Sequence, residues 1–389
     1  MCGIAGVVEA EGSPSRELLE RMGGAIAHRG PDDGRIDIFG RAGFSFRRLS
    51  IIDVAGGAQP ISNETGRIHV MANGEIYNYL DLRRELESLG HRFKTHSDVE
   101  TIVHGYEQWG DDIPKHLHGM FAFAIWDEDR QRLLLGRDRL GKKPLIYAEA
   151  KGRITFGSEF MAVLADRRVS READHAAIHD YLTYQYVPAP ASGFKAVKKL
   201  EPAHVLVFEG GVAKTTRYWQ PDCTPRLDLS MEDAVAETEK RLKEAVRKRL
   251  MSEVPLGAFL SGGVDSSVIV ALMSEFTKVK TFSIGFEESG FNELPHARAV
   301  AERYATDHHE FVVKSNAAEV LPKLVRHYGE PYADSSALPS YYLAKLTREH
   351  VTVALNGDGG DEFFAGYDRY RALQYFKLAR LMMPLAPVA

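Results

Sequence analysis

The sequence has 389 residues, more than a single hydrophobic core usually accommodates, so two or three domains are expected. Its 44% hydrophobic and 26% charged residues are typical of a folded globular protein and exclude a disordered chain. The 49 Lys and Arg residues against 54 Asp and Glu give a net charge of −5, which argues against a nucleic acid as the main partner.

The sequence also speaks against a membrane or secreted protein. No apolar run approaches the roughly 18 residues that a membrane-spanning helix needs, and the first residues lack the basic region of a signal peptide. The chain has 2 cysteines, Cys2 and Cys223, which excludes a disulfide framework. We therefore expect a cytoplasmic protein with no membrane partner.

The first half of the chain is predicted to form short antiparallel strands with helices between them. Helical patterns occupy residues 15–26 and 79–89. Gly-rich or charged turns separate the expected strands, which lie at residues 121–126, 132–135, 144–147 and 153–156. This mixture favours an α+β domain over an all-β domain.

The pattern changes after a polar stretch with two prolines at residues 218–230, which is typical of a linker. A helix is expected at residues 233–250, and strands and helices then alternate. The expected strands are 254–260, 281–286, 310–313 and 351–355, and the expected helices begin at residues 266 and 293. Such alternation predicts parallel βαβ units and an α/β domain.

Cys2 follows the initiator methionine and carries the first chemical signal. If Met1 is removed, Cys2 holds both a thiol and a free α-amine, whose pKa near 7.7–8.0 lets it accept a proton at neutral pH. The amine can then act as the base for the thiol of its own residue. Taken alone, a cysteine at position 2 is more often incidental.

Several motifs accompany Cys2 over roughly residues 2–190. They are His28–Asp32, Arg48–Asp53, Asn73–Asn78, Ser97–Asp98 and Gly119–Phe123. With these motifs in this order, the first part of the chain resembles the class II glutamine amidotransferase domain family, whose members use an N-terminal nucleophile. The resemblance implies a four-layer αββα sandwich.

The resemblance also implies roles for individual residues. Cys2 would attack the side-chain amide of glutamine, and the Asn73 side chain and the Gly74 backbone N–H would stabilise the oxyanion. Glutamine would be bound by Arg48, Leu49, Ser50, Ile51, Ile52, Asn73, Gly74, Glu75 and Asp98, with Arg48 on the α-carboxylate and Glu75 and Asp98 on the α-ammonium. Outside the motif, Asn73-Gly74 is typical of a type I′ hairpin turn, and Arg48 and Asp98 of solvated surface charges.

A second motif, Ser261-Gly262-Gly263-Val264-Asp265-Ser266-Ser267, lies between an expected strand and an expected helix. That setting directs backbone N–H groups and a helix N-terminus toward an anion. The loop lacks the lysine and spacing of a Walker A motif, and a Ser/Gly run by itself is more often a plain turn.

This loop resembles the pyrophosphate-binding loop of the ATP pyrophosphatase (PP-loop) family, and Asn356–Glu362 agrees with it. The whole chain is similar to the glutamine-hydrolysing asparagine synthase family. The resemblance implies ATP binding by Leu260, Ser261, Gly262, Gly263, Asp265, Ser266, Ser267, Ile284, Asn356 and Gly357. Asp265 and Asp361 would hold Mg²⁺ with the pyrophosphate, and Asp358 would be a catalytic residue at an aspartyl-AMP intermediate.

The expected reaction is the amidation of aspartate, with glutamine and ATP as the other substrates and AMP and pyrophosphate released. Ammonia would pass from Cys2 to the adenylate by an enclosed, largely apolar route, because free ammonia is mostly protonated at pH 7. We expect a glutaminase domain at 2–215, a linker at 216–230 and an ATP-binding domain at 231–389. That last domain would be adenine nucleotide α-hydrolase-like and C-terminally incomplete, because the family usually extends further. A homodimer is left open.

Two other functions stay open on the sequence. A relative of the same family could amidate another carboxylate, such as a sugar acid or a secondary metabolite, and Asn356 and Asp358 differ from the Ser and Glu of some family members. The chain could instead be a non-catalytic module that senses glutamine or a nucleotide. The presence of Cys2, Asn73 and Asp265 argues against that module.

Overall fold

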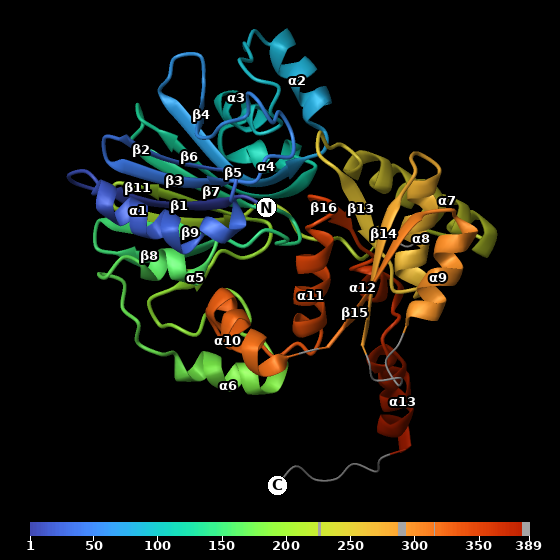
Figure 1. Ribbon diagram of the computed structural model, residues 1–389. Helices are drawn as coiled ribbons and strands as arrows, with labels where there is room; N and C mark the ends of the chain where they lie inside the picture. The colour runs from blue at the N-terminus through green and yellow to red at the C-terminus, as the bar shows by residue number, and fades with distance from the viewer. Residues whose placement is uncertain (225–226, 287–292, 315, 383–389) are drawn as a thin grey trace. The chain divides into compact units, whose positions relative to one another are not determined.

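The computed structural model describes residues 1–224, 227–286, 293–314 and 316–382 (Figure 1). Its contacts divide the chain into two compact units. The first contains Met1–Ser230, Met251–Val254 and Asn316–Leu338, and the second contains Met231–Leu250, Pro255–Ser315 and Pro339–Ala389. Residues 225–226 of the predicted linker lie outside the described residues, and the predicted functional domain limits stay a prediction.

The first unit contains two antiparallel sheets of six strands each. The strand order β10-β8-β9-β1-β3-β2 builds one sheet from β1 (Gly3–Glu9), β2 (Asp33–Phe39), β3 (Ala42–Arg48), β8 (Ile146–Ala150), β9 (Arg153–Gly157) and β10 (Lys198–Lys199). The order β12-β11-β7-β6-β5-β4 builds the other from β4 (Ile61–Ser62), β5 (Ile68–Ile76), β6 (Gly119–Asp127), β7 (Arg132–Arg137), β11 (His204–Glu209) and β12 (Val212–Arg217).

Helices α1 to α5 pack on the outer faces of these sheets, and the unit contains further helices as well. The helices of the unit are α1 (Arg16–Ala25), α2 (Tyr79–Ser88), α3 (Glu100–Trp109), α4 (Ile113–His116), α5 (Phe160–Leu164), α6 (His175–Tyr184) and α10 (Ala317–Tyr328), with short 3₁₀ turns η1 (Ala27–Arg29) and η2 (Gly110–Asp112). In Figure 1, α1 and α5 lie along the sheet that contains β1, whereas α3 and α4 lie along the sheet that contains β5.

The apolar run of β6 shows why the layers stack in this way. Successive side chains of a strand point to opposite faces of the sheet. Ala122, Ala124 and Trp126 therefore enter the core between the two sheets, where they meet side chains such as Ile4 and Phe44. The alternate β6 side chains pack beneath α2, α3 and α4 instead. Both faces of β6 are buried, and the predicted αββα arrangement is confirmed.

The second unit is built on a parallel sheet of four strands in the order β15-β14-β13-β16. The strands are β13 (Leu256–Phe259), β14 (Lys280–Phe286), β15 (Asp307–Val313) and β16 (Val353–Leu355). The helices are α7 (Met231–Arg249), α8 (Val264–Ser274), α9 (Leu294–Arg303), α11 (Ala337–Thr347), α12 (Gly360–Phe364) and α13 (Asp368–Met382). The predicted α/β class is confirmed for this unit.

The strand order of the second unit reverses at β13. From β13 the chain continues through β14 and β15 on one side, and it then returns to place β16 on the other side of β13. Ligands of open α/β sheets bind at the carboxyl ends of the strands that flank such a reversal. The segments after β13 and β16 contain the two motifs at Ser261–Ser267 and Asn356–Glu362.

Most elements expected from the sequence are present within a few residues of their predicted limits, including the helix at 231–249 and the strand at 307–313. The strands β1 to β5 and the helix α3 were not predicted individually. Within the described residues, no helix combines the length and the apolar character that crossing a bilayer requires.

The pairing of β5 with β6 yields a first prediction, at Gly74. A Cβ atom added to Gly74 would lie 2.0 Å from the Met120 carbonyl oxygen, and neither backbone can move without disturbing the sheet. We expect Gly74→Ala to lower the free energy of unfolding by about 1–3 kcal/mol. Urea unfolding followed by circular dichroism measures the loss.

Gly24→Ala is the matched control, because this exposed glycine of α1 has no atom within 4 Å of its added Cβ. Alanine is the better helix former, so this variant should be neutral or gain up to about 1 kcal/mol. A Gly74→Ala protein as stable as the Gly24→Ala protein would contradict the close approach of the two strands.

Candidate active sites

Cys2 is the residue directly before β1, next to the end of the pairing between β1 and β3. Its Sγ is 3.5 Å from both the N–H and the carbonyl oxygen of Leu49, the residue that follows β3. Burial raises the pKa of the Cys2 thiol, although the Leu49 N–H opposes this by favouring the thiolate.

Asn73 and Gly74 lie inside β5 and are paired with β6, so the hairpin turn that the dipeptide suggests in isolation is wrong. Asn73 is fully buried. With its amide oriented to satisfy both neighbours, Nδ2 donates to the Cys2 carbonyl oxygen at 3.0 Å and Oδ1 accepts from an Arg29 Nη2 at 3.2 Å. Asn73 thereby connects the two sheets beside Cys2.

Arg29 contacts both Asn73 and Cys2, and the sequence analysis assigned no role to it. Its Nε donates to the Cys2 carbonyl oxygen at 3.1 Å, and its Nη1 donates to Glu159 Oε1 at 2.9 Å. Arg29 lies inside the His28–Asp32 motif, so its position in the motif was the available signal. Glu159 had no sequence signal, because it reaches the site only through the fold.

Arg48 is buried, with 8% exposure, so the interpretation of Arg48 as a solvated surface charge is wrong. Its Nη1 and Nη2 donate to the carbonyl oxygens of Val54 and Asp53 at 3.0 and 2.6 Å. A guanidinium has five N–H donors. Arg48 therefore keeps donors for a further acceptor while two backbone carbonyls fix its position.

The loop at residues 49–54 is fixed by two carboxylates, those of Asp32 and Glu253, to which the sequence analysis assigned no role. The Ser50 N–H donates to Asp32 Oδ2 at 2.8 Å. The Glu253 carboxylate accepts the N–H groups of Asp53 and Val54 at 2.9 and 3.0 Å, and the Glu253 N–H donates to the Ile51 carbonyl oxygen at 3.0 Å. Ile52 is half-buried in the same loop. The loop is thus held rigidly beside Cys2.

Two buried carboxylates lie near Cys2. Asp98 is 4% exposed, which rules out a solvated surface charge, and its Oδ2 accepts the Ile76 N–H at 2.7 Å. Burial raises the pKa of Asp98 to about 6. Burial and the charge of Asp98 together raise the pKa of Glu75 well above its usual range. A positively charged group next to this pair would stabilise the ionised carboxylates.

Lys143 is the buried cation that faces this pair. It is 4% exposed, and its ammonium contacts the Met1 sulfur. Burial and the Arg29 charge lower the pKa of Lys143 to about 8, against the opposing effect of Glu75. Nothing in the local sequence pattern indicates that Lys143 is buried.

The second candidate site follows β13. Leu260 is buried, and its N–H donates to the Phe282 carbonyl oxygen at 2.9 Å. Its carbonyl oxygen accepts the Ser283 hydroxyl, which precedes the half-buried Ile284 of β14. The sequence-predicted residues Leu260 and Ile284 therefore occupy the same edge of the sheet.

The Ser/Gly loop folds tightly between β13 and α8. Gly262 has a φ of +84°, and a Cβ atom there would lie 2.5 Å from the backbone of α9. Ser261 Oγ accepts the Gly263 N–H at 3.2 Å, and Ser267 Oγ donates to the Gly263 carbonyl oxygen at 2.7 Å. The buried Ser266 hydroxyl lies 3.0 Å from that of Ser261. The loop thus presents a compact, partly exposed turn at the N-terminus of α8.

The loop after β16 packs on Asp265. A Cβ atom at Gly357 would lie 2.8 Å from the Asp265 backbone, and one at Gly360 would lie 2.3 Å from the Asp265 carboxylate. Burial raises the pKa of Asp265, and the neighbouring charges of Asp361 and Glu362 raise it further. The second unit therefore gathers carboxylates beside the Ser/Gly loop.

Asn356 and Asp358 are exposed at the start of the same loop. Asn356 Nδ2 donates to Asp358 Oδ2 at 2.6 Å, which holds the two side chains together. Hard carboxylate oxygens of this kind suit Mg²⁺, so the residues near Asp265 and Asp361 fit that ion in chemical character.

The two parts of the chain are similar to two known protein families. The glutamine amidotransferase domain model matches residues 1–219, and the asparagine synthase model matches residues 237–386. "Asparagine synthetase [glutamine-hydrolyzing] 1" of Bacillus subtilis is 38% identical, over 95% of this chain and 60% of that protein. "Putative asparagine synthetase [glutamine-hydrolyzing] 2" of Methanocaldococcus jannaschii is 36% identical, over 94% of this chain and 76% of that protein.

A solved structure of glutamine phosphoribosylpyrophosphate amidotransferase from Bacillus subtilis is similar at 15% identity and a TM-score of 0.42, over 82% of this chain and 70% of that one. The chain spans about 60% of the length of the Bacillus subtilis synthetase. The amidotransferase model covers more than half of the chain, and the Methanocaldococcus relative is matched over most of its length. By these matches, the chain belongs to the family of glutamine-hydrolysing asparagine synthetases.

Proposed function

We propose that the protein makes asparagine from aspartate, with glutamine as the nitrogen donor and ATP as the activating substrate. The observation that carries this proposal is the meeting of Cys2 with Asn73 across the two sheets of the first unit. A plain binding module has no need for a buried amide fixed beside a thiol at the second position of the chain.

The first step is the attack of Cys2 on glutamine. After removal of Met1, the α-amine of Cys2 takes the proton of the thiol, and the thiolate attacks the side-chain amide carbon. The C–N bond then breaks, ammonia leaves with the transferred proton, and a thioester remains on Sγ. Water hydrolyses the thioester to glutamate and regenerates Cys2.

Asn73 and Gly74 supply the oxyanion donors in this proposal. Asn73 Nδ2 already points toward Cys2, where it donates to the Cys2 carbonyl oxygen at 3.0 Å. The close packing of Gly74 against the Met120 carbonyl keeps its backbone fixed. Donors that do not have to reorganise stabilise the developing charge, and one such donor is worth about 10²–10³ in rate.

The charged groups of glutamine have matching partners in the same unit. The remaining donors of Arg48 take the α-carboxylate, and the Glu75 and Asp98 carboxylates take the α-ammonium. The backbone of residues 49–52 contributes polar contacts along the ligand. Recognition by both charged groups excludes simple amides as substrates.

In the second unit, the Ser261–Ser267 loop and the Asn356-Gly357 segment are proposed to hold ATP. Leu260 and Ile284 would contact the nucleoside, and Asp265 and Asp361 would hold Mg²⁺ together with the pyrophosphate. Mg²⁺, when bound, neutralises charge on the phosphate oxygens. The aspartate carboxylate attacks the α-phosphorus, pyrophosphate leaves, and ammonia displaces AMP from the aspartyl-AMP, with Asp358 at the reacting centre.

The proposal is tested by product analysis with ATP, Mg²⁺, glutamine and aspartate. We expect asparagine, AMP and pyrophosphate in equal amounts. Replacing aspartate by a panel of sugar acids and other carboxylates identifies the acceptor. Pyrophosphate release that depends on another acid and not on aspartate would favour the alternative acceptor, and release with none of them would contradict the synthetase proposal.

Cys2→Ala separates the two half-reactions. The variant lacks the nucleophile, so glutamine-dependent activity should fall to background. Activity with ammonium chloride as the nitrogen source should stay within experimental error of the wild type, because ammonia needs only the adenylate. Asparagine formation with each nitrogen source is the measurement, and equal loss of both activities would contradict independent sites.

The carboxylate pair predicts a pH dependence of glutamine use. Asp98 must be ionised to attract the α-ammonium, and its pKa is raised to about 6. The kcat/KM for glutamine should therefore fall more steeply as the pH drops below about 6. Asp98→Asn should raise KM about tenfold or more, because a charge-assisted hydrogen bond is lost, and should remove this steeper limb. An unchanged profile in Asp98→Asn would contradict the role of this carboxylate.

Asp265→Asn tests the metal-binding role. Replacing this carboxylate relieves repulsion from Asp361 and Glu362, so the variant should fold at least as stably as the wild type. Aspartate-dependent exchange of pyrophosphate into ATP should nevertheless fall by about 10²-fold or more, with glutaminase activity retained. Glu362→Gln, which relieves the same repulsion, is the matched control. Equal exchange rates in the two variants would count against Asp265 as a ligand.

A further inference from the structure

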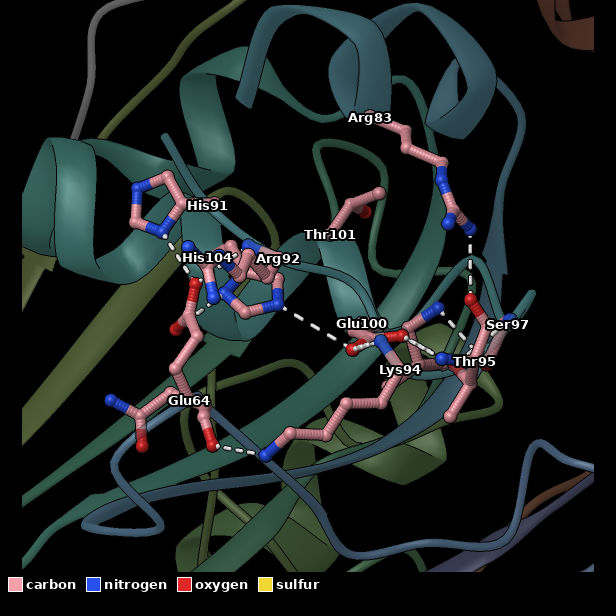
Figure 2. Close-up of polar contacts among 12 residues, drawn as sticks. Glu64, Arg83, His91, Arg92, Lys94, Thr95, Ser97, Glu100, Thr101 and His104 are labelled. Carbon is pink, nitrogen blue, oxygen red and sulfur yellow. Dashed lines mark hydrogen bonds and ion pairs between the residues drawn. The ribbon is translucent and has the colours of Figure 1, made fainter. Parts of the chain in front are cut away.

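A group of histidines and glutamates lies in the first unit, and the proposed reaction does not use it. Glu64, His91, His104 and Glu107 each offer one ligand atom, and all these atoms lie within 4.8 Å of one another. Figure 2 shows His91, His104 and Glu64 turned toward a common point, with Glu100 behind His104. We propose that these four side chains form a binding site for a divalent transition-metal ion such as Zn²⁺.

Four separations between atoms of these side chains are close to the separation expected around a tetrahedral ion. Bonds of about 2.1 Å at tetrahedral angles place neighbouring ligand atoms about 3.4 Å apart. His104 Nδ1 is 3.3 Å from both Glu64 Oε2 and Glu107 Oε2. His91 Nδ1 is 3.4 Å from Glu64 Oε1 and 3.7 Å from Glu107 Oε2. Only small side-chain movements are needed to centre an ion.

The fold brings the ligands together from three segments. His104 and Glu107 are three residues apart on α3 and therefore share one face of that helix. His91 lies in the segment after α2, and Glu64 lies in the turn between β4 and β5. Since the other two ligands come from separate segments, the His104–Glu107 spacing alone did not indicate a metal site, and the sequence did not predict it.

An outer shell orients the ligands. Glu100 is fully buried and lies 3.5 Å from His104 Nε2 through its Oε1. The N–H groups of Lys94 and Thr95 each donate to Glu100 at 2.7 Å. A carboxylate behind the second ring nitrogen is the usual support of a metal-bound imidazole.

The carboxylate ligands are also fixed by neighbours. The Asn63 side chain donates to Glu107 Oε1 at 2.7 Å, and the Arg92 N–H donates to Glu64 Oε1 at 2.8 Å. Lys94 is the nearby cation, and its ammonium donates to the Asn63 carbonyl oxygen at 2.9 Å. Two carboxylates offset the charge of a divalent ion, and imidazole nitrogens favour Zn²⁺ over Mg²⁺ or Ca²⁺.

A proton is the competitor for this position. Although burial lowers the pKa of His104, its contacts with Glu100 and Glu107 and the charge of Glu64 raise it to about 9 overall. A protonated His104 would make the group an ion-pair network. Nitrogen–oxygen distances of 3.3–3.7 Å fit either an ion or a proton between these groups, and direct binding measurements separate the two cases.

A second group, His28, Glu159 and His327, is less suited to a cation. The Arg29 guanidinium donates to Glu159 Oε1 at 2.9 Å, the same oxygen that lies 2.9 Å from His28 Nε2. That oxygen is therefore already shared, and the positive charge of Arg29 repels an incoming ion. This group supplies a control for the binding experiment.

The test is titration of the metal-free full-length chain, without a histidine tag, with Zn²⁺ by calorimetry and equilibrium dialysis. We expect one tight site in the wild type and in Cys2→Ala. His91→Ala and Glu107→Gln should each weaken it by more than about 100-fold, because each removes a direct ligand. The matched controls His96→Ala, an exposed histidine in the same segment, and His28→Ala should bind as the wild type does.

Two further readouts keep the test independent of folding defects. Circular dichroism and the thermal midpoint without metal should be the same for His91→Ala and the wild type, and Zn²⁺ should raise the midpoint only in the wild type. Co²⁺ should give the wild type the visible absorption of a four-coordinate ion, and His91→Ala should lack it. No Zn²⁺ binding by the wild type, or binding unaffected by His91→Ala, would overturn the site in favour of the ion-pair network.

Discussion

The contact of the buried Asn73 amide with the Cys2 carbonyl oxygen is the interaction on which the proposed chemistry depends. Cys2 precedes β1 in one sheet, and Asn73 belongs to β5 in the other. The core between the sheets sets their spacing, so the packing of side chains such as Trp126 fixes the distance between the Cys2 backbone and the Asn73 amide. Stability and reactivity of the first unit are therefore linked through the same layer.

Burial governs the electrostatics of this unit. Asp98, Glu75 and Lys143 are all removed from water, and each carries a pKa shifted toward its neutral form. A ligand with one positive and one negative group that pairs with these side chains offsets the free-energy cost of burying their charges. A site of this kind binds a zwitterionic amino acid and disfavours an uncharged amide, which agrees with glutamine as the proposed nitrogen donor.

In the second unit, the order of the strands determines where the candidate site lies. The reversal of strand order at β13 places the Ser/Gly loop and the acidic loop after β16 at one edge of the sheet. Glycines at 262, 357 and 360 allow close backbone approach there, because a Cβ atom at each would collide with its neighbours. The carboxylates gathered around Asp265 repel one another, and a bound cation would relieve that repulsion.

Local patterns in the sequence predicted much of this architecture. The β6 run and the alternation after residue 230 predicted the fold classes. The motifs pointed to the half-buried Cys2 and to the buried residues Arg48, Asn73 and Asp98. In isolation, Asn73-Gly74 suggested a turn, and only the pairing of β5 with β6 excludes it.

Residues that act through long-range contacts could not be predicted. Glu253 fixes a loop about 200 positions earlier in the chain, and Glu159 pairs with Arg29 from a segment 130 positions away. Lys143 is buried by the fold, and nothing in its local sequence indicates this burial. The proposed metal site of Glu64, His91, His104 and Glu107 comes from three segments, so no single stretch of the sequence indicates it.

The most direct test of the central claim is mass spectrometry of the mature protein after treatment with a glutamine analogue that carries a chloroketone. We predict that Met1 is absent and that one molecule of the analogue is attached to Cys2, with Cys223 unmodified and free glutamine protecting Cys2. Retention of Met1 in protein that still hydrolyses glutamine, or labelling confined to Cys223, would contradict the account.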